Sequence, residues 1–156
     1  MKMLVLGAGL QGCATAFDLP QNPAVTQVTI ADLHPEQLAS FLDPYKGTDR
    51  LKAVKLDVKD LPAVTALMRG HVSVMSAIPY YFNASMAACA VEAGCHFADL
   101  GGNTEIVFEQ KKLHAAAAAK GLSVIPDCGL APGMVNILAA EGIRRLAEIA
   151  FSVNER

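Results

Sequence analysis

The chain has 156 residues, 53% of them hydrophobic, and its 13 basic and 15 acidic residues leave a formal net charge of −2. A chain of this length buries about 70% of its unfolded surface, so we expect one compact domain that needs no cross-links. The balanced charge, without a basic run, excludes a broad electrostatic attraction to nucleic acid or to an anionic membrane. No apolar run approaches the ~20 residues that a membrane span needs. We therefore expect neither a nucleic-acid partner nor a membrane partner.

The four cysteines indicate the redox environment. Cys13, Cys89, Cys95 and Cys128 lack the spacing of a zinc site. An α/β domain of this size does not need disulfides, so free thiols and a cytoplasmic location are expected, with no metal. Cys13 falls in the first predicted helix, where we expect it to pack as a small apolar side chain rather than to react.

A strand, a glycine loop and a helix open the chain. The apolar residues 1–6 predict a strand, and residues 10–19 predict a helix. Between them, Gly7, Gly9 and Gly12 have the spacing GxGxxG: the first permits a tight turn, the second lets a pyrophosphate approach the backbone, and the third allows close helix packing. The helix N-terminus then offers unpaired N–H groups and a positive dipole end to the anion. This context predicts a dinucleotide site.

The second predicted strand, residues 27–32, ends in an acid. Asp32 stands about twenty residues after the glycine loop, where a carboxylate accepts hydrogen bonds from the adenosine ribose. A 2′-phosphate at ~4 Å would be repelled by roughly 4 kcal/mol per unit charge. Since Leu33, His34 and Pro35 offer no strong cation, the sequence favours NAD over NADP. The alternative is that Asp32 only caps a turn before Pro35.

The rest of the chain continues the alternation of strands and helices. We expect, in order, a helix over residues 35–42, a strand at 51–56, a helix near 64–68, a strand at 72–75, a helix over 84–93, a strand at 95–98, a helix over 104–119, a strand at 122–125 and a last helix over 134–149. Asn103 or Thr104 caps the helix that Gly121 closes. The predicted fold is α/β, a Rossmann-type doubly wound parallel sheet of six strands in the order 3-2-1-4-5-6 with helices on both faces, over residues 1–149.

Ligands of such sheets bind outside the carboxyl ends of the strands. Asp57 and Val58 follow the third strand, where they would flank an adenine. Ala77, Ile78 and Pro79 follow the fourth strand, where the chain passes the pyrophosphate and the nicotinamide ribose. For Asp57, ordinary turn chemistry is an equally good explanation.

Two further loops converge on the same cleft. Asp99 and the glycines after it follow the fifth strand, and Asp127 opens the glycine- and proline-rich loop that follows the sixth. For Asp99, a role in the site and a role in the turn are equally good explanations. We expect Gly129 and Gly133 to be needed for the backbone conformation of their loop. No metal, phosphotransfer or nucleophile motif stands out in the sequence.

Four motifs resemble one family. LVLGAGLQG at residues 4–12, AIPYYFN at 77–83, ADLGG at 98–102 and IPDCGLAPGMVNILA at 125–139 are similar to saccharopine dehydrogenase-like oxidoreductases, nearest to their bacterial lysine epsilon-dehydrogenase branch. The resemblance implies NAD-dependent oxidation of the lysine side-chain amine to the semialdehyde, with release of ammonia, by hydride transfer and imine hydrolysis.

The resemblance also implies site residues. The implied cofactor contacts are Gly7, Gly9, Leu10, Gln11 and Gly12 for the pyrophosphate, Asp32 for the ribose, Asp57 and Val58 for the adenine, and Ala77, Ile78 and Pro79 on the nicotinamide side. Tyr80, Asp99 and Asp127 are the candidates nearest the chemistry. There an acid would orient the substrate ammonium or relay its proton, and a tyrosine hydroxyl would hydrogen-bond it.

The chain departs from the family in its length. Such enzymes continue into a second α/β domain, so we expect residues 150–156 to be the stub of a strand that leads into an absent substrate domain. Alone, residues 148–153 would be disordered or would pair with another copy's edge in a homo-oligomer. We expect this chain to bind NAD and to take an amino acid as its substrate, but to oxidise lysine poorly or not at all. A saccharopine-type reductase domain and a stand-alone NAD-sensing module remain as alternatives.

Overall fold

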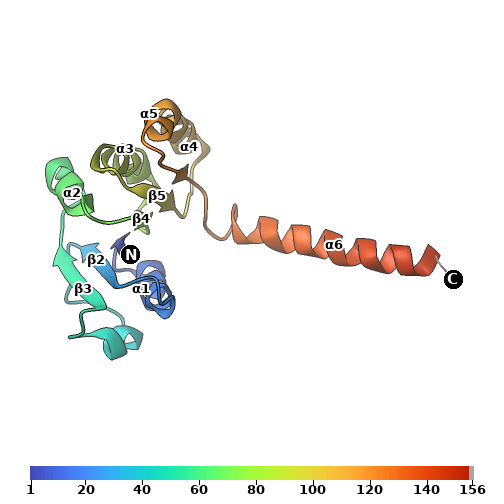
Figure 1. Cartoon of the computed structure of the whole chain (residues 1–156), viewed down its shortest axis with the longest axis horizontal. Coiled ribbons are helices and arrows are strands. Elements are labelled where there is room, and N and C mark those ends of the chain that lie inside the picture. The colour runs from blue at the N-terminus through green and yellow to red at the C-terminus, as the bar shows by residue number, and fades with distance from the viewer. Residues whose placement is uncertain (155–156) are drawn as a thin grey trace.

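A computed structural model describes residues 1–154, and the side chains of residues 1–149. Its centre is a six-stranded parallel sheet in the order β3-β2-β1-β4-β5-β6, which confirms the predicted fold and strand order (Figure 1). The strands are β1 (Lys2–Leu6), β2 (Gln27–Asp32), β3 (Leu51–Lys55), β4 (Ser73–Ser76), β5 (His96–Asp99) and β6 (Val124–Ile125). The α-helices are α1 (Leu10–Asp18), α2 (Leu61–Met68), α3 (Asn83–Ala93), α4 (Thr104–Lys111), α5 (His114–Ala119) and α6 (Met134–Asn154). Three short 3₁₀ segments are η1 (Leu19–Gln21), η2 (Ser40–Tyr45) and η3 (Tyr80–Phe82).

Apolar side chains form a core on each face of the sheet. On one face α1 and η2 pack over β1 and β2, with Val5, Cys13 and Leu42 almost fully buried. On the other face lie α2, α3, α4 and α5, and the core there includes Leu4 and Phe97 (Figure 1). Helices on both faces explain why the central strands β1 and β2 are mostly buried and apolar, whereas the edge strand β3 is largely exposed. Cys13 packs in the core, as predicted.

The helix predicted over residues 35–42 is wrong. The chain is non-helical from Pro35 to Ala39, and the 3₁₀ segment η2 then places Leu42 in the core with no exposed surface. Eight residues make too short a helix to be stable without packing, because the first turn fixes many dihedrals for one hydrogen bond. The tighter η2 buries Leu42 directly, and Leu38 packs against the same cluster.

The helix predicted over residues 104–119 is two helices. α4 is capped by Asn103, whose side chain accepts hydrogen bonds from the backbone N–H groups of Glu105 and Ile106, so Asn103 is the cap rather than Thr104. After α4 the N–H groups of Lys112 and Leu113 bond to carbonyls three residues back, at 3.2 and 3.0 Å. This tighter spacing interrupts the α-helical repeat.

The last helix begins at Met134 as predicted but does not end near residue 149. It continues to Asn154, so the strand predicted over residues 150–156 is wrong for 150–154, while residues 155–156 lie outside the described part of the chain. A strand without a partner leaves its backbone groups unpaired, whereas a helix satisfies them within the segment. Figure 1 shows α6 projecting away from the sheet. Within the described residues, no helix has the length and apolar character that crossing a membrane requires.

Candidate functional site

At the turn from β1 into α1, two of the three glycines are required for steric reasons. Gly7 has φ +94°, and a Cβ added to it would lie 2.8 Å from the carbonyl oxygen of Ala77. A Cβ on Gly12 would lie 1.9 Å from the carbonyl oxygen of Gly7. A Cβ on Gly9 would meet no atom within 4 Å. Gly7 and Gly12 therefore shape the turn, while Gly9 faces open space at the N-cap of α1.

Asp32 connects this loop to the end of β2. Its Oδ2 accepts a hydrogen bond from the backbone N–H of Ala8 at 2.7 Å, and its Oδ1 accepts one from the N–H of His34 at 2.9 Å. The carboxylate is half-buried, so its position is fixed while part of it still faces solvent. The turn role and the site role proposed for Asp32 are therefore compatible.

A cleft of about 310 Å³ lies at the carboxyl ends of β2, β3 and β4. It brings together six of the residues that the sequence assigned to the cofactor: Gly7, Asp32, Asp57, Val58, Ile78 and Pro79. The sequence interpretation missed others that line it, namely Ala31, Leu33, Leu56, Lys59, Tyr81 and Phe82. Tyr81 and Phe82 belong to the 77–83 motif, and two aromatic residues directly after a strand were the signal that could have identified them.

The other predicted cofactor residues lie beside this cleft. Gly9, Leu10 and Gln11 form the start of α1, and Leu10 is 74% exposed there. Ala77 lies beneath the glycine turn, and its N–H donates to the carbonyl of Leu6 at 2.8 Å.

Asp57 has a local hydrogen bond of its own. Its Oδ1 accepts from the backbone N–H of Lys59 at 2.9 Å, which is the turn role anticipated for it. The same turn brings Lys59 into the cleft as a cation that the sequence interpretation had not considered.

Asp99 is buried, with 1% of its surface exposed. One oxygen accepts from the backbone N–H groups of Gly101 and Asp127, at 2.7 and 3.2 Å, and the other accepts from the side-chain amide of Gln110 at 2.6 Å. A carboxylate that is enclosed and hydrogen-bonded in this way holds the two loops after β5 and β6 together. Asp99 is therefore placed to position neighbouring groups rather than to contact a substrate.

Tyr80 and Asp127, the other two predicted catalytic candidates, lie around the same loops. Asp127 is half-buried with φ +61°, and its carboxylate lies against Gly101, where a Cβ would come within 2.1 Å of Oδ1. Tyr80 is 43% exposed, and its Cβ would be 3.2 Å from a Cβ on Gly102. Both side chains therefore face the loop that follows β5. Burial, with the charges of Asp99 and Asp127, raises the pKa of the nearby Cys128 thiol, which disfavours a reactive thiolate.

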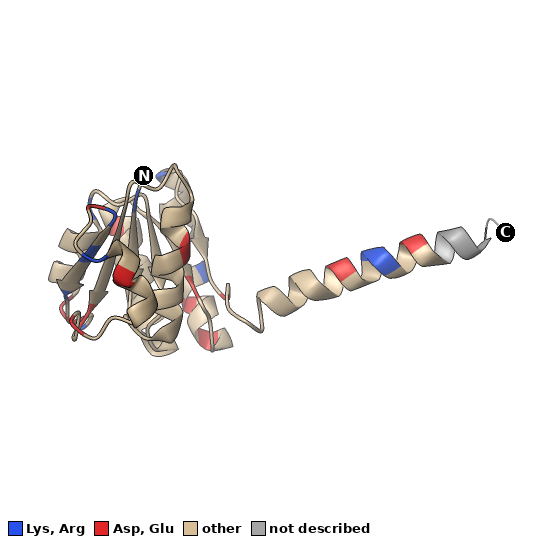
Figure 2. Ribbon diagram, turned by 90° about the horizontal axis from the view of Figure 1, so that it is seen from below, with Lys and Arg blue, Asp and Glu red and all other residues tan. Residues whose placement is uncertain are grey.

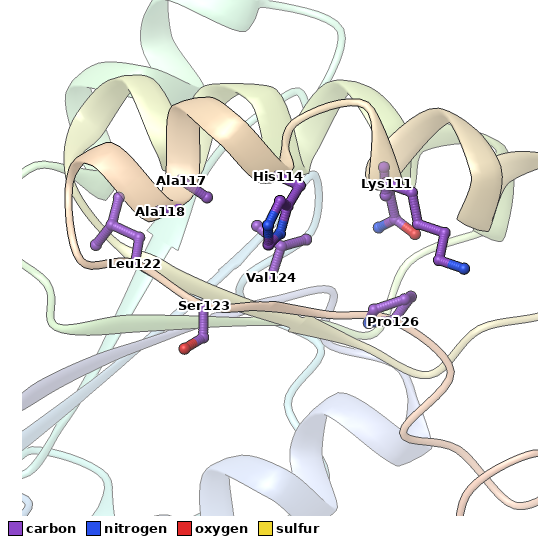
Figure 3. Close-up of a pocket in the computed structure, with 9 residues that line it drawn as sticks. Lys111, His114, Ala117, Ala118, Leu122, Ser123, Val124 and Pro126 are labelled. Carbon is purple, nitrogen blue, oxygen red and sulfur yellow. The ribbon is translucent and has the colours of Figure 1, made fainter.

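A second cavity, of about 570 Å³, lies away from the glycine loop, between β6 and the helices α4 and α5. In Figure 3 the side chains of Lys111 and His114 extend from these helices toward the segment that carries Val124 and Pro126. Its wall is mainly apolar, and the predicted cofactor residues line the smaller cleft instead. Size alone therefore does not identify the nucleotide site.

A doubly wound parallel sheet, a glycine turn before the first helix and a carboxylate at the end of β2 define a dinucleotide-binding Rossmann domain. The sequence profile of the saccharopine dehydrogenase NADP binding domain matches residues 3–125, and the chain belongs to this family. It is therefore a pyridine-nucleotide-binding domain of the saccharopine dehydrogenase type, and the family resemblance read from the four motifs is confirmed.

The chain spans about a third of the length of the saccharopine dehydrogenases that it matches. The chain is 29% identical over 145 residues to "Saccharopine dehydrogenase [NADP(+), L-glutamate-forming]" of Pyricularia oryzae, covering 93% of this chain and 30% of the relative. It is 24% identical to the enzyme of the same name from Schizosaccharomyces pombe, covering 93% of this chain and 31% of the relative. The structure of apo saccharopine dehydrogenase (L-Glu forming) from Saccharomyces cerevisiae shares the fold, with a TM-score of 0.76 and 23% identity over 94% of this chain and 31% of that one.

Proposed function

We propose that this chain is the NAD-binding part of an oxidoreductase that oxidises an amine carbon of an amino acid, with the lysine side chain as the substrate. One observation carries the proposal: the Asp32 carboxylate accepts a hydrogen bond from the glycine turn, and Gly7 and Asp32 line the same cleft. Family membership supports the reaction class. The four sequence motifs, which resemble those of lysine epsilon-dehydrogenases, are the basis for the proposed substrate.

The residues fit a dinucleotide. The open space at Gly9 would admit the pyrophosphate against the start of α1, where backbone N–H groups and the helix dipole favour an anion. Asp32 would accept hydrogen bonds from the adenosine ribose. Bound there, the nicotinamide would supply the acceptor for a hydride.

Three charged side chains line the cleft: Asp57 would flank the adenine, while Asp32 and Lys59 would act on a 2′-phosphate. The carboxylate of Asp32 would repel a 2′-phosphate by roughly 4 kcal/mol per unit charge at ~4 Å. Lys59 lines the same cleft and is exposed, so water screens its opposing attraction. The fixed, half-buried carboxylate outweighs the exposed cation, which favours NAD.

Substrate chemistry would take place on the other side of β1, near the loops after β5 and β6. Tyr80 would hydrogen-bond the substrate amine, and Asp127 would hold its ammonium or accept its proton. The exposed surface of Tyr80 supports this assignment. Asp99 would keep Asp127 in position through the bond from the Asp127 N–H.

A second candidate is a saccharopine-forming reductase that uses NADP. The names of the two fungal relatives described above favour it, and so does the presence of Lys59 in the cleft. The two candidates differ in the cofactor that they bind more tightly.

Calorimetric titration of the chain with NADH and with NADPH, at one salt concentration, tests the proposal. We expect the unsubstituted chain to bind NADH more tightly than NADPH. Asp32→Asn should reduce this difference in affinity, because it improves NADPH binding relative to NADH binding. Lys59→Gln is the matched control, and it should weaken NADPH more than NADH. A preference of the unsubstituted chain for NADPH would support the second candidate instead, and a chain that binds neither nucleotide would contradict both.

A further inference from the structure

We propose that Tyr81 stacks on the adenine ring of the bound nucleotide and so sets the affinity of the adenosine half of the site. The inference rests on the proposed function, because it assigns a residue to the same cleft. The 77–83 motif contains Tyr81 but assigned it no role, and the structure places Tyr81 among the residues that line the cleft, as it does Val58 and Leu33.

Two consecutive tyrosines have different further neighbours, although their rings contact each other. Tyr80 lies against Gly102, in the loop that follows β5. Tyr81 lines the cleft formed by the ends of β2, β3 and β4. Because β2 and β3 lie on one side of β1 and β5 lies on the other, Tyr80 belongs to the substrate side and Tyr81 to the adenosine side.

The ring of Tyr81 is supported but not enclosed. Its centroid is 4.6 Å from that of Phe82, at an interplanar angle of 49°, and 5.6 Å from that of Tyr80, at 78°. Phe82 in turn packs against the core cluster under α3, which anchors the aromatic group. Tyr81 nevertheless keeps 58% of its surface exposed. A supported aromatic ring with a free surface at the wall of a cleft is suited to stack on a flat heteroaromatic ring.

The cleft has the chemistry that a purine requires. Leu33, Leu56 and Val58 supply apolar walls, and the carboxylate of Asp32 stands where the attached ribose would lie. A volume of about 310 Å³ is at the small end of the range for ligand clefts. An adenine between these aliphatic side chains and Tyr81 would bury both faces of its ring.

The chain offers a direct optical test, because it has no tryptophan. Tyr81→Trp would place a single tryptophan at the proposed stacking position. Tyr45→Trp is the matched control: Tyr45 lies in η2 with its ring 5.8 Å from that of Phe17, away from the residues that line the cleft. AMP, which carries the adenine without a nicotinamide, should quench the fluorescence of the Tyr81→Trp protein, and NADH should do the same. AMP should leave the Tyr45→Trp protein unchanged.

Affinity gives the second readout. Removing a stacked aromatic ring typically weakens binding about 5- to 150-fold per base, so Tyr81→Ala should weaken AMP and NADH within that range. Tyr81→Phe should keep the affinity of the unsubstituted chain, because it keeps the ring. Circular dichroism of each variant checks that the fold is retained.

The outcomes separate this inference from the proposed function. NADH binding that is unchanged by Tyr81→Ala, or a Tyr81→Trp protein that binds NADH without quenching by AMP, would overturn the stacking role and leave the nucleotide site intact. An unsubstituted chain that binds neither NADH nor NADPH would overturn both.

Discussion

Gly9, the N-cap of α1, and Gly12, in its first turn, are three residues apart, yet their surroundings differ. A Cβ on Gly12 would overlap the Gly7 carbonyl oxygen at 1.9 Å, whereas a Cβ on Gly9 would meet nothing within 4 Å. Gly9 also has φ −66°, which alanine adopts without strain. We therefore expect Gly9→Ala to keep the folding stability and to weaken NADH by about tenfold or more, which corresponds to about 1.4 kcal/mol.

Gly12→Ala is the counterpart of that prediction. It should destabilise the fold by about 1–3 kcal/mol, because the loop backbone must move to admit the methyl group. Thermal unfolding and calorimetric titration of the two variants give the comparison. If Gly9→Ala bound NADH as tightly as the unsubstituted chain, the pyrophosphate could not lie against Gly9.

Single residues could be singled out from the sequence where one segment shows the signal. Gly7, Gly12 and Asp32 stand out because a glycine spacing and a strand end can be recognised along the chain, although Gly7 meets Ala77 and Asp32 bonds to Ala8 across the fold. Tyr81 and Lys59 were missed because they meet only in a cleft that three loops form, and those loops are far apart in the sequence. The spacing of residues within one segment carries no information about which segments lie together in the fold.

At the scale of elements, Asp99 shows how two loops are tied to one strand. Its side chain accepts from the N–H groups of Gly101 and Asp127 and from the Gln110 amide. Asp99→Ala would leave these three donors without their acceptor, and each buried donor left unpaired costs about 1–3 kcal/mol. We expect a loss of about 3 kcal/mol or more in the free energy of unfolding, measured by urea denaturation.

Asp99→Asn provides the control. The carbonyl oxygen of the substituted side chain would still accept from both backbone N–H groups. Gln110 Oε1 is a buried side-chain oxygen without a hydrogen-bond partner among the described residues, so a turned Gln110 amide would accept from the amide that replaces the carboxylate. The loss in the free energy of unfolding should then be less than half of the loss for Asp99→Ala. Equal losses for the two variants would show that the negative charge, and not the hydrogen bonding, holds the loops.

Most elements were predicted within two residues, because the switch between strand and helix periodicity is strong in an α/β chain. Two of the failures have a common cause. The 35–42 segment and the 104–119 segment both have helical composition, but packing determines their structure: Leu42 reaches the core from η2, and Leu113 packs under α3 after α4 ends. Tertiary contacts of this kind override a propensity worth tenths of a kcal/mol per residue.

At the scale of the whole molecule, α6 stands apart from the folded core. Its large apolar side chains remain exposed, with Ile137 at 73%, Ile143 at 69% and Leu146 at 67%. Figure 2 shows that its first turns carry no charge and that acidic and basic residues alternate further along. Arg144 and Arg145 both hydrogen-bond Glu141, and these bonds lower the pKa of that carboxyl to about 2. Ion pairs at i,i+3 and i,i+4 stabilise a helix without contacts to the rest of the protein.

The core should therefore fold without most of α6. The backbone bonds that fix the start of the helix run from Met134 to Gly129, from Val135 to Leu130 and from Asn136 to Gly133, so a chain ending at Asn136 keeps all three. We expect its unfolding temperature to lie within about 4 °C of the full chain, since about 1 kcal/mol shifts a domain of this size by 2–4 °C. Calorimetry of both chains measures the difference, and NADH titration of the shortened chain checks that the cleft is intact. A decrease of about 10 °C or more, well beyond that range, would mean that α6 contributes to the stability of the sheet in solution, and the core could not then be treated as independent of it.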